Sequence, residues 1–147
     1  MEATADEIQK LVDALDAGRN AWVNGRAEHF GTDHMTQAPD MTIFGPFGGL
    51  ARNGPGFEEM QARMAAQFES GSGRCELVSA MASGDLVVLV MMERNDVTFA
   101  GRSAPQPWVL RTTQVFRRDG ERWMRLHRHA DPLIERRSFD ETLALAR

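Results

Sequence analysis

Arginine and histidine are concentrated on one strand of a hairpin expected near the C-terminus. The segment from Trp108 to Pro132 reads WVLRTTQVFRRDGERWMRLHRHADP, and the Asp119-Gly120 pair within it is a strong signal for a tight turn between two strands. Side chains alternate across a strand, so the second strand presents a different set to each face of its sheet. One set is Trp123, Arg125, His127 and His129, and the other is Met124, Leu126, Arg128 and Ala130. The set that lines a cavity decides which side chains can act on a ligand.

Arg128 is the strongest candidate for binding an oxygen atom of a ligand, provided that its side of the strand lines a cavity. A guanidinium group in an apolar site presents a planar fork that suits a carboxylate or an enolate-like oxygen. A buried cation without a partner is costly, so Arg128 needs an anion. That anion can come from a substrate or from an internal carboxylate such as Glu93 or Asp40, and the sequence leaves both open.

Three other residues are candidates for acid–base chemistry. Glu93 ends the most apolar strand, and a carboxylate buried there can have a raised pKa and act as acid or base. The alternative for Glu93 is a solvated strand end. His34 and Asp40 lie on the loop before the first expected strand, where a histidine near an aspartate can form an oriented general base.

His127 and His129 lie on the same face of one strand, two residues apart. Two histidines alone do not make a zinc site, which usually has three or four protein ligands, so no metal site is predicted. A role as catalytic base, or in packing at an interface, stays open for both. A slip of one residue in strand register reverses their face.

The elements that must position these residues alternate along a chain of 147 residues, which we interpret as one domain, residues 1–147. We expect helices over residues 4–24 and 26–34, a short strand over 41–44, and a third helix that starts near Pro55, with Asn53 or Gly54 as its cap. The SGSG run at residues 70–73 should end that helix. Strands follow over 76–82 and 86–95, then the hairpin and a terminal helix capped by Ser138. This order predicts an α+β fold, with helices packed on one face of a curved sheet.

Composition excludes several classes of protein. The net charge of −4 argues against a nucleic-acid surface, and no apolar run is long enough to span a bilayer. The acidic N-terminal residues lack an apolar signal core, so we expect a cytoplasmic location. Cys75 is the only cysteine and fits a buried structural role. The glycine-rich loop over residues 45–56 lacks the spacing of a phosphate-binding loop, and no cofactor is predicted.

The chain resembles the nuclear-transport-factor-2-like superfamily, and within it the polyketide-cyclase-like (SnoaL-like) and ketosteroid-isomerase-like small proteins. The resemblance covers nearly the whole chain and rests on the first helix, on MTIFGPFGG, on GDLVVLVMMER and on RTTQVFRRDGERWMRLHRHADP. The last segment is also similar to a run in the association domain of calmodulin-dependent kinases. The fold that this resemblance implies is a cone, or cystatin-like roll, in which a strongly curved mixed or antiparallel sheet wraps three helices around a pocket.

The catalytic residues of these relatives do not transfer to this chain. Where ketosteroid isomerases have their base aspartate, the best register places Gly45, and the chain has no tyrosine to serve as oxyanion donor. Their second acid falls at Thr112 or Gln114, and the acid of polyketide cyclases falls at about Arg128. The resemblance therefore implies the fold and a pocket but no known mechanism.

The same register implies which side chains face the pocket. These are Leu110, Thr112, Gln114 and Phe116 from one strand and Met124, Leu126 and Arg128 from the next. Trp22, Phe44, Phe47 and Trp108 are the expected aromatic walls, although they can equally fill the core. Arg125, His127 and His129 should face outward, where members of the superfamily commonly pair as dimers.

These observations predict a small-molecule-binding protein with an apolar cone pocket. It could be a cofactor-free isomerase, cyclase, dehydratase or hydrolase acting on a carbonyl-bearing or anionic compound. Arg128 would then polarise an oxygen, with Gln114 and Thr112 as further donors and Glu93, His34 or Asp40 as base. The alternative is a ligand-binding or dimerising module without catalysis. The expected partners are a small ligand and a second copy of the chain.

Overall fold

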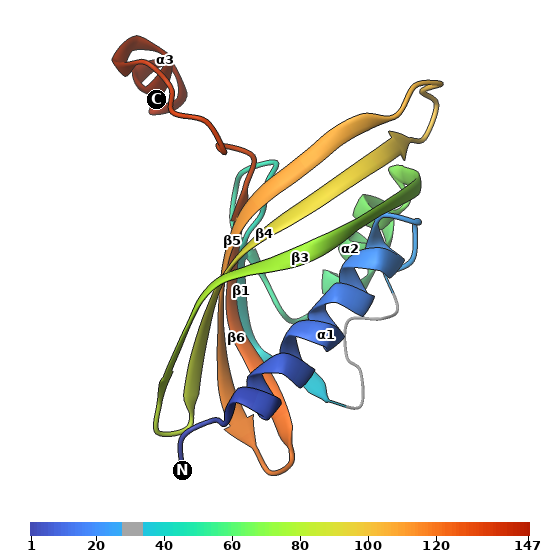
Figure 1. Cartoon of the computed structure of the whole chain (residues 1–147). Coiled ribbons are helices and arrows are strands. Elements are labelled where there is room, and N and C mark those ends of the chain that lie inside the picture. The colour runs from blue at the N-terminus through green and yellow to red at the C-terminus, as the bar shows by residue number, and fades with distance from the viewer. Residues whose placement is uncertain (28–33) are drawn as a thin grey trace.

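The structure is a computed structural model, and it describes residues 1–27 and 34–147. It is an α+β fold in which six strands form one strongly curved mixed sheet, in the order β2-β1-β6-β5-β4-β3 (Figure 1). Only β1 and β6 pair in parallel. The elements are α1 (Ala5–Trp22), β1 (Met35–Phe44), β2 (Ala51–Arg52), α2 (Phe57–Ala65), β3 (Phe68–Ser83), β4 (Leu86–Phe99), β5 (Gln106–Asp119), β6 (Arg122–Asp131) and α3 (Phe139–Leu145).

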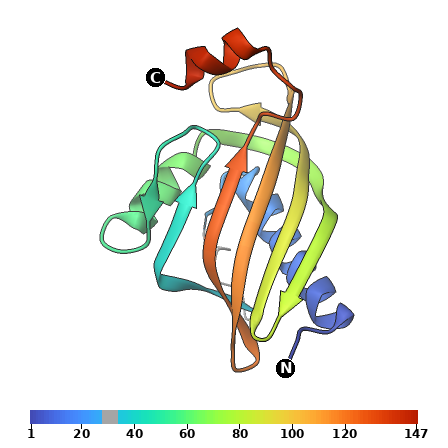
Figure 2. The ribbon, with the colours of Figure 1, turned by 90° about the vertical axis from the view of Figure 1, so that its left-hand side faces the viewer.

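Helix α1 covers the concave face of the sheet and forms the main core with it (Figure 1). A capping box between Thr4 and Glu7 fixes its first turn. Its buried stripe includes Leu11 and Leu15, which pack against side chains of β4, β5 and β6. None of the described helices lies over the convex face (Figure 2). Among the described residues, β4 is therefore covered by a helix on its concave side.

A β-bulge in β6 decides which of its side chains face the concave side. Val115 of β5 lies opposite His127, but Phe116 lies opposite Arg125, so Leu126 is an extra residue without a cross-strand partner. Before the bulge, Trp123 and Arg125 point inward, and both are buried. After the bulge the alternation is reset, so that Arg128 lines the concave side as well.

The prediction that side chains alternate strictly between the two faces of the sheet was therefore wrong for part of β6. Arg125 was expected to face outward but is only 1% exposed on the concave side. Trp123, which shares its face, is buried in the α1 core, and Met124 does not line the cavity. For Arg128 the expected orientation is confirmed, and His127 and His129 follow β6 on the opposite face.

The SGSG run does not end a helix, as predicted, but lies inside β3. Its two glycines are required because α1 and β4 approach closely there. A Cβ atom at Gly71 would lie 3.0 Å from the Cβ of Val23, and one at Gly73 would collide with the carbonyl oxygen of Arg94. The glycine content predicted an end to the helix, whereas residues 70–73 belong to a strand whose two glycines allow close packing.

Other sequence predictions were close to the observed elements. Helix α2 is capped by Gly56 rather than Asn53 or Gly54, and it packs against β1 at the open end of the cone. The predicted terminal helix is confirmed as α3, with a capping box between Ser138 and Glu141, and it projects away from the sheet (Figure 1). The helix expected over residues 26–34 lies largely outside the described residues. None of the described helices is long and apolar enough to cross a membrane.

Gly73→Ala is expected to destabilise the fold by about 2 kcal/mol or more, because the added methyl group meets backbone atoms that cannot move independently. Gly45→Ala is the matched control, since a Cβ atom there has nothing within 4 Å, and it should change the free energy of unfolding by less than about 0.5 kcal/mol. Urea denaturation measures both values. Equal stabilities would mean that β4 does not approach β3 this closely at Gly73.

Candidate functional site

A cavity of about 230 Å³ opens between α1, α2, the loop after β1 and the concave face of the sheet. Its apolar walls come from α1, α2, β1, β3 and β5. Charged and amide side chains gather on the sheet and on α1. The residues that line it and carry the argument are Arg19, Glu93, Asn95, Gln114, Arg125 and Arg128.

Arg128 forms a two-point ion pair with Glu93 in the cavity. Its Nη1 atom lies 2.6 Å and its Nη2 atom 3.0 Å from the two carboxylate oxygens. Burial opposes the charged form of Arg128, but the attraction and hydrogen bonds of Glu93 outweigh it and raise the pKa of Arg128. Of the two partners left open by the sequence, the internal carboxylate Glu93 is the one observed. Both oxygens of Glu93 are thus engaged by Arg128.

Arg125 lies beside Arg128 but interacts with carboxamides. Its Nε atom donates to Oε1 of Gln37 and its Nη1 atom to Oε1 of Gln114, each at 3.0 Å. Burial, and next the charge of Arg128, lower the pKa of Arg125 to about 9. Because Gln114 accepts through its oxygen, its Nε2 atom is fixed as a donor. That atom is buried and has no hydrogen-bond partner among the described residues.

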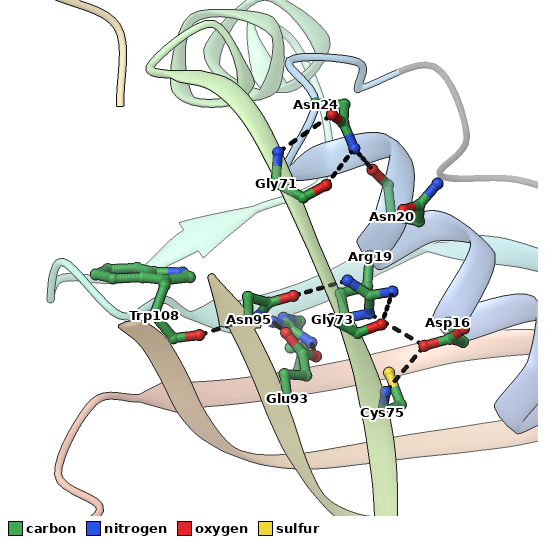
Figure 3. Close-up of polar contacts among 11 residues, drawn as sticks. Asp16, Arg19, Asn20, Asn24, Gly71, Gly73, Cys75, Glu93, Asn95 and Trp108 are labelled. Carbon is green, nitrogen blue, oxygen red and sulfur yellow. Dashed lines mark hydrogen bonds and ion pairs between the residues drawn. The ribbon is translucent and has the colours of Figure 1, made fainter. Parts of the chain in front are cut away.

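Arg19 brings a third guanidinium group to the cavity wall from α1 (Figure 3). It donates to Oδ1 of Asn95 at 2.7 Å and to the carbonyl oxygen of Gly73 at 2.9 Å, and its Nε atom pairs with Asp16 at 3.1 Å. Asn95 in turn donates to the carbonyl oxygen of Trp108. These bonds join α1 to β3, β4 and β5 around the cavity.

Cys75 lies behind this network, where its backbone N–H donates to Asp16 (Figure 3). Burial, and next the charges of Glu93 and Asp16, raise the pKa of its thiol to about 12. A thiol with so high a pKa is a poor nucleophile at neutral pH, which agrees with a structural role for Cys75.

Aromatic rings surround the mouth of the cavity. Trp108 stacks on Phe47 with ring centroids 5.4 Å apart, and it meets Phe68 and Phe99 edge-on. Trp22 packs near Phe68 at 6.5 Å. The mouth therefore offers flat apolar surfaces above the polar groups.

The predicted site residues fall into two groups. Those that line the cavity are Trp22, Phe47, Glu93, Trp108, Gln114 and Arg128. Five others do not line it. Thr112 is buried and donates to the carbonyl oxygen of Met91, and Leu126 packs against a cluster that includes Met41 and Phe57.

The remaining three of these five are Phe44, His34 and Asp40. Phe44 lies on the convex face, where its ring meets His127 and His129 edge-on. His34 and Asp40 are exposed. Whether any predicted residue acts on a ligand stays a prediction.

Sequence reasoning missed Arg19, Asn95 and Arg125 as cavity residues. A signal for Arg19 was present, because it continues the buried spacing of Leu11 and Leu15 along α1. Asn95 shares the parity of Glu93 on β4, so it also could have been found. Arg125 could not, because its orientation depends on the bulge at Leu126.

Polar groups also meet on the convex face. The Nδ1 atom of His127 lies 2.7 Å from Oγ1 of Thr42, and Nε2 of His129 lies 3.5 Å from Asp131. Arg111 holds Asp131 through two bonds of 2.8 and 2.9 Å, and this hydrogen bonding lowers the pKa of the Asp131 carboxyl. Within residues 1–27 and 34–147, no group of three or more potential ligands is arranged to hold a metal ion.

Comparison of this sequence with models of known protein families identifies one family. The family model described as SnoaL-like domain matches residues 12–135. No curated protein sequence matches the chain significantly.

Several solved structures have the same fold at low sequence identity. A candidate dehydratase of the NTF2-like family from Streptomyces avermitilis is 18% identical, with a TM-score of 0.70 over 90% of this chain and 100% of that one. A nuclear transport factor 2-like superfamily protein from Salmonella enterica is 14% identical, with a TM-score of 0.70 over 94% and 99% of the two chains. The association domain of C. elegans CaMKII is 14% identical, with a TM-score of 0.61 over 86% and 95%. At these identities the similarity concerns the fold.

The Glu93–Arg128 pair predicts strong energetic coupling. Glu93→Leu or Arg128→Met alone should each cost about 3–5 kcal/mol of stability, because each leaves a buried charge without its partner. The double variant should be more stable than either single variant, since no charge is then left uncompensated. Denaturation of all four proteins gives the coupling energy.

The Arg111–Asp131 pair is the control, because Arg111 is half exposed and its bonds have similar lengths. Arg111→Met should cost no more than about 1 kcal/mol. Additive effects of the two cavity substitutions would contradict the buried pairing.

Proposed function

The chain belongs to the SnoaL-like domain family, and we propose that it binds a small, largely apolar molecule through a carbonyl or carboxylate oxygen. The oxygen accepts from the side chain of Gln114 and lies close to the guanidinium group of Arg125. This assigns recognition to Arg125 and Gln114 rather than to Arg128, which is held by Glu93.

The observation that carries the proposal is the orientation of the Gln114 carboxamide. Its oxygen accepts from Arg125, so only its nitrogen is left to face a ligand, and the residue is 0% exposed. A buried donor without an acceptor costs about 1–3 kcal/mol, and such groups in native proteins usually have a partner. A ligand oxygen in the cavity would be that partner.

Charge supports an anion in the same place. Among the described residues that line the cavity, Arg19, Arg125 and Arg128 are basic and Glu93 is the one acid. Arg19 is paired with Asp16 and Arg128 with Glu93, but guanidinium donors in a poorly solvated site still favour a carboxylate over a neutral carbonyl. We therefore expect acids to bind more tightly than ketones of the same shape.

Size and walls limit the rest of the ligand. The volume of about 230 Å³ lies below the range of roughly 300–1,000 Å³ found for drug-sized ligands. Trp22, Phe68 and Trp108 line the cavity and provide flat apolar surfaces for the ligand. A small aromatic or alicyclic acid fits these constraints.

Binding without a chemical step is the function that these contacts support best. Both oxygens of Glu93 are occupied, and His34 and Asp40, the other predicted bases, are exposed away from the lining. A proton-transfer reaction would have to release Glu93 from Arg128. Product analysis after binding decides between a binding protein and an enzyme.

The binding proposal predicts that 2-naphthoate binds at least about tenfold more tightly than naphthalene, because a hydrogen bond to a charged group contributes about 1.5–3 kcal/mol. Gln114→Glu keeps the shape of the side chain but places an anion beside Arg125. It should therefore lower the affinity for 2-naphthoate by about tenfold or more and leave the affinity for naphthalene unchanged. Calorimetry measures the affinities, and chromatography of the recovered ligand detects turnover.

Thr112→Val is the matched control, since Thr112 is buried on the same strand but does not line the cavity. The affinity of the Thr112→Val variant for 2-naphthoate should equal that of the wild type. Equal binding of naphthoate and naphthalene, or full affinity in Gln114→Glu, would rule out the proposed oxygen site.

We also propose that two copies pair through the convex face of the sheet. His127 and His129 belong to this face, as predicted, while Arg125 does not. The stronger support is apolar exposure, because Met81 on β3 is 52% exposed and Leu86 on β4 is 43% exposed, and both alternate with side chains of the concave face. Contiguous exposed apolar side chains on one face commonly mark an interaction surface.

The pairing predicts a mass near twice 16.4 kDa in solution by light scattering. Met81→Glu should give the monomer mass without loss of secondary structure, because its side chain is exposed within one chain and a buried carboxylate at an interface is costly. Leu50→Glu, an equally exposed site at the cavity mouth, should remain dimeric. A monomeric wild type would exclude this pairing.

A further inference from the structure

A second hollow lies on the other side of the Phe47–Trp108 stack. It is an open groove formed by the end of α2, the residues between α2 and β3, and the connection between β4 and β5. Its lining residues are Phe47, Arg63, Ala66, Gln67, Phe99, Ala100, Arg102, Gln106 and Trp108.

The groove carries positive charge. Arg63 comes from α2 and Arg102 from the β4–β5 connection, so two elements far apart in the chain bring guanidinium groups to one place. None of the described lining residues of the groove is acidic. Neither arginine takes part in an ion pair in the described part of the chain. Both are exposed and offer planar donors suited to a carboxylate or phosphate.

The groove and the cavity are adjacent, because Phe47 and Trp108 line both. Phe47 is 55% exposed and lies beside Gly48 and Gly49, whose φ angles are +92° and +73°. A Cβ atom at either glycine would have nothing within 4 Å, so the space beside the backbone that follows Phe47 is open. An apolar chain can therefore run from the cavity along Trp108 into the groove by displacing one exposed ring.

We propose that the cavity and the groove are the two ends of one binding site for an elongated molecule with an acidic group at each end. The inner acid is bound at Gln114 and Arg125, and the outer acid at Arg63 and Arg102. The middle of the ligand is apolar and lies against Trp108. The inner end rests on the function proposed above, whereas the outer end rests on the groove alone.

The test is calorimetry with two series, the straight-chain dicarboxylates from hexanedioate to dodecanedioate and the monocarboxylates of the same lengths. At one chain length the dicarboxylate should bind about fivefold more tightly than its monocarboxylate, as expected for an exposed charge pair. Arg63→Gln/Arg102→Gln should reduce this advantage to less than about twofold and leave the monocarboxylate unchanged. The advantage should also shrink as the salt concentration rises, because the outer end is solvated.

Lys10→Gln/Arg117→Gln is the matched control. It removes the same charge from two exposed residues that line neither hollow, and the advantage should persist. If monocarboxylates fail to bind at all, the inner site is wrong. If they bind but no dicarboxylate gains affinity, or if the gain survives in Arg63→Gln/Arg102→Gln, the outer site is wrong and the inner one stands.

Discussion

One extra residue in β6 sets the polar lining of the cavity. Because Leu126 has no partner across β5, the alternation of side chains is interrupted, and both Arg125 and Arg128 reach the concave face. A regular strand would place one guanidinium group inside and the other outside, as parity requires. Two neighbouring cations under a helix are costly, so the bulge must be compensated by their surroundings. β-Bulges often redirect side chains beside functional sites, and this one acts in that way.

The two arginines are compensated differently, and this difference gives the cavity its chemistry. Arg128 is neutralised by Glu93, whereas Arg125 interacts with the oxygens of Gln37 and Gln114. A carboxamide oxygen accepts a hydrogen bond from a guanidinium group without adding a negative charge, and the Nε2 atoms of Gln37 and Gln114 are buried without a hydrogen-bond partner among the described residues. Arg19 adds a third guanidinium group from α1, and its partners are Asp16 and Asn95. We propose that these donors select an anionic or carbonyl oxygen and that the aromatic rings of the lining select the apolar remainder.

The sequence predicted the fold, the cavity and about half of its polar residues. Apolar spacing located α1, α2 and β4, and the family resemblance supplied the curved sheet that brings Glu93, Gln114 and Arg128 together. Two local features escaped it. The glycines at 71 and 73 resemble a loop in composition, although they form a strand on which α1 packs closely. The bulge at Leu126 has no composition signal, because it results from the pairing of β6 with β1 and β5, and so Arg125 was assigned to the wrong face.

The central claim is that a ligand acid binds at Arg125 and Gln114 while Arg128 keeps Glu93. A crystal structure with 4-bromobenzoate tests this most directly, because the anomalous signal of bromine fixes the orientation of the ring. We expect the carboxylate within hydrogen-bond distance of the Gln114 nitrogen and the bromine toward Trp108, with the Glu93–Arg128 pair intact. A carboxylate bound to Arg128 with Glu93 displaced, or Arg125 on the convex face, would contradict the account.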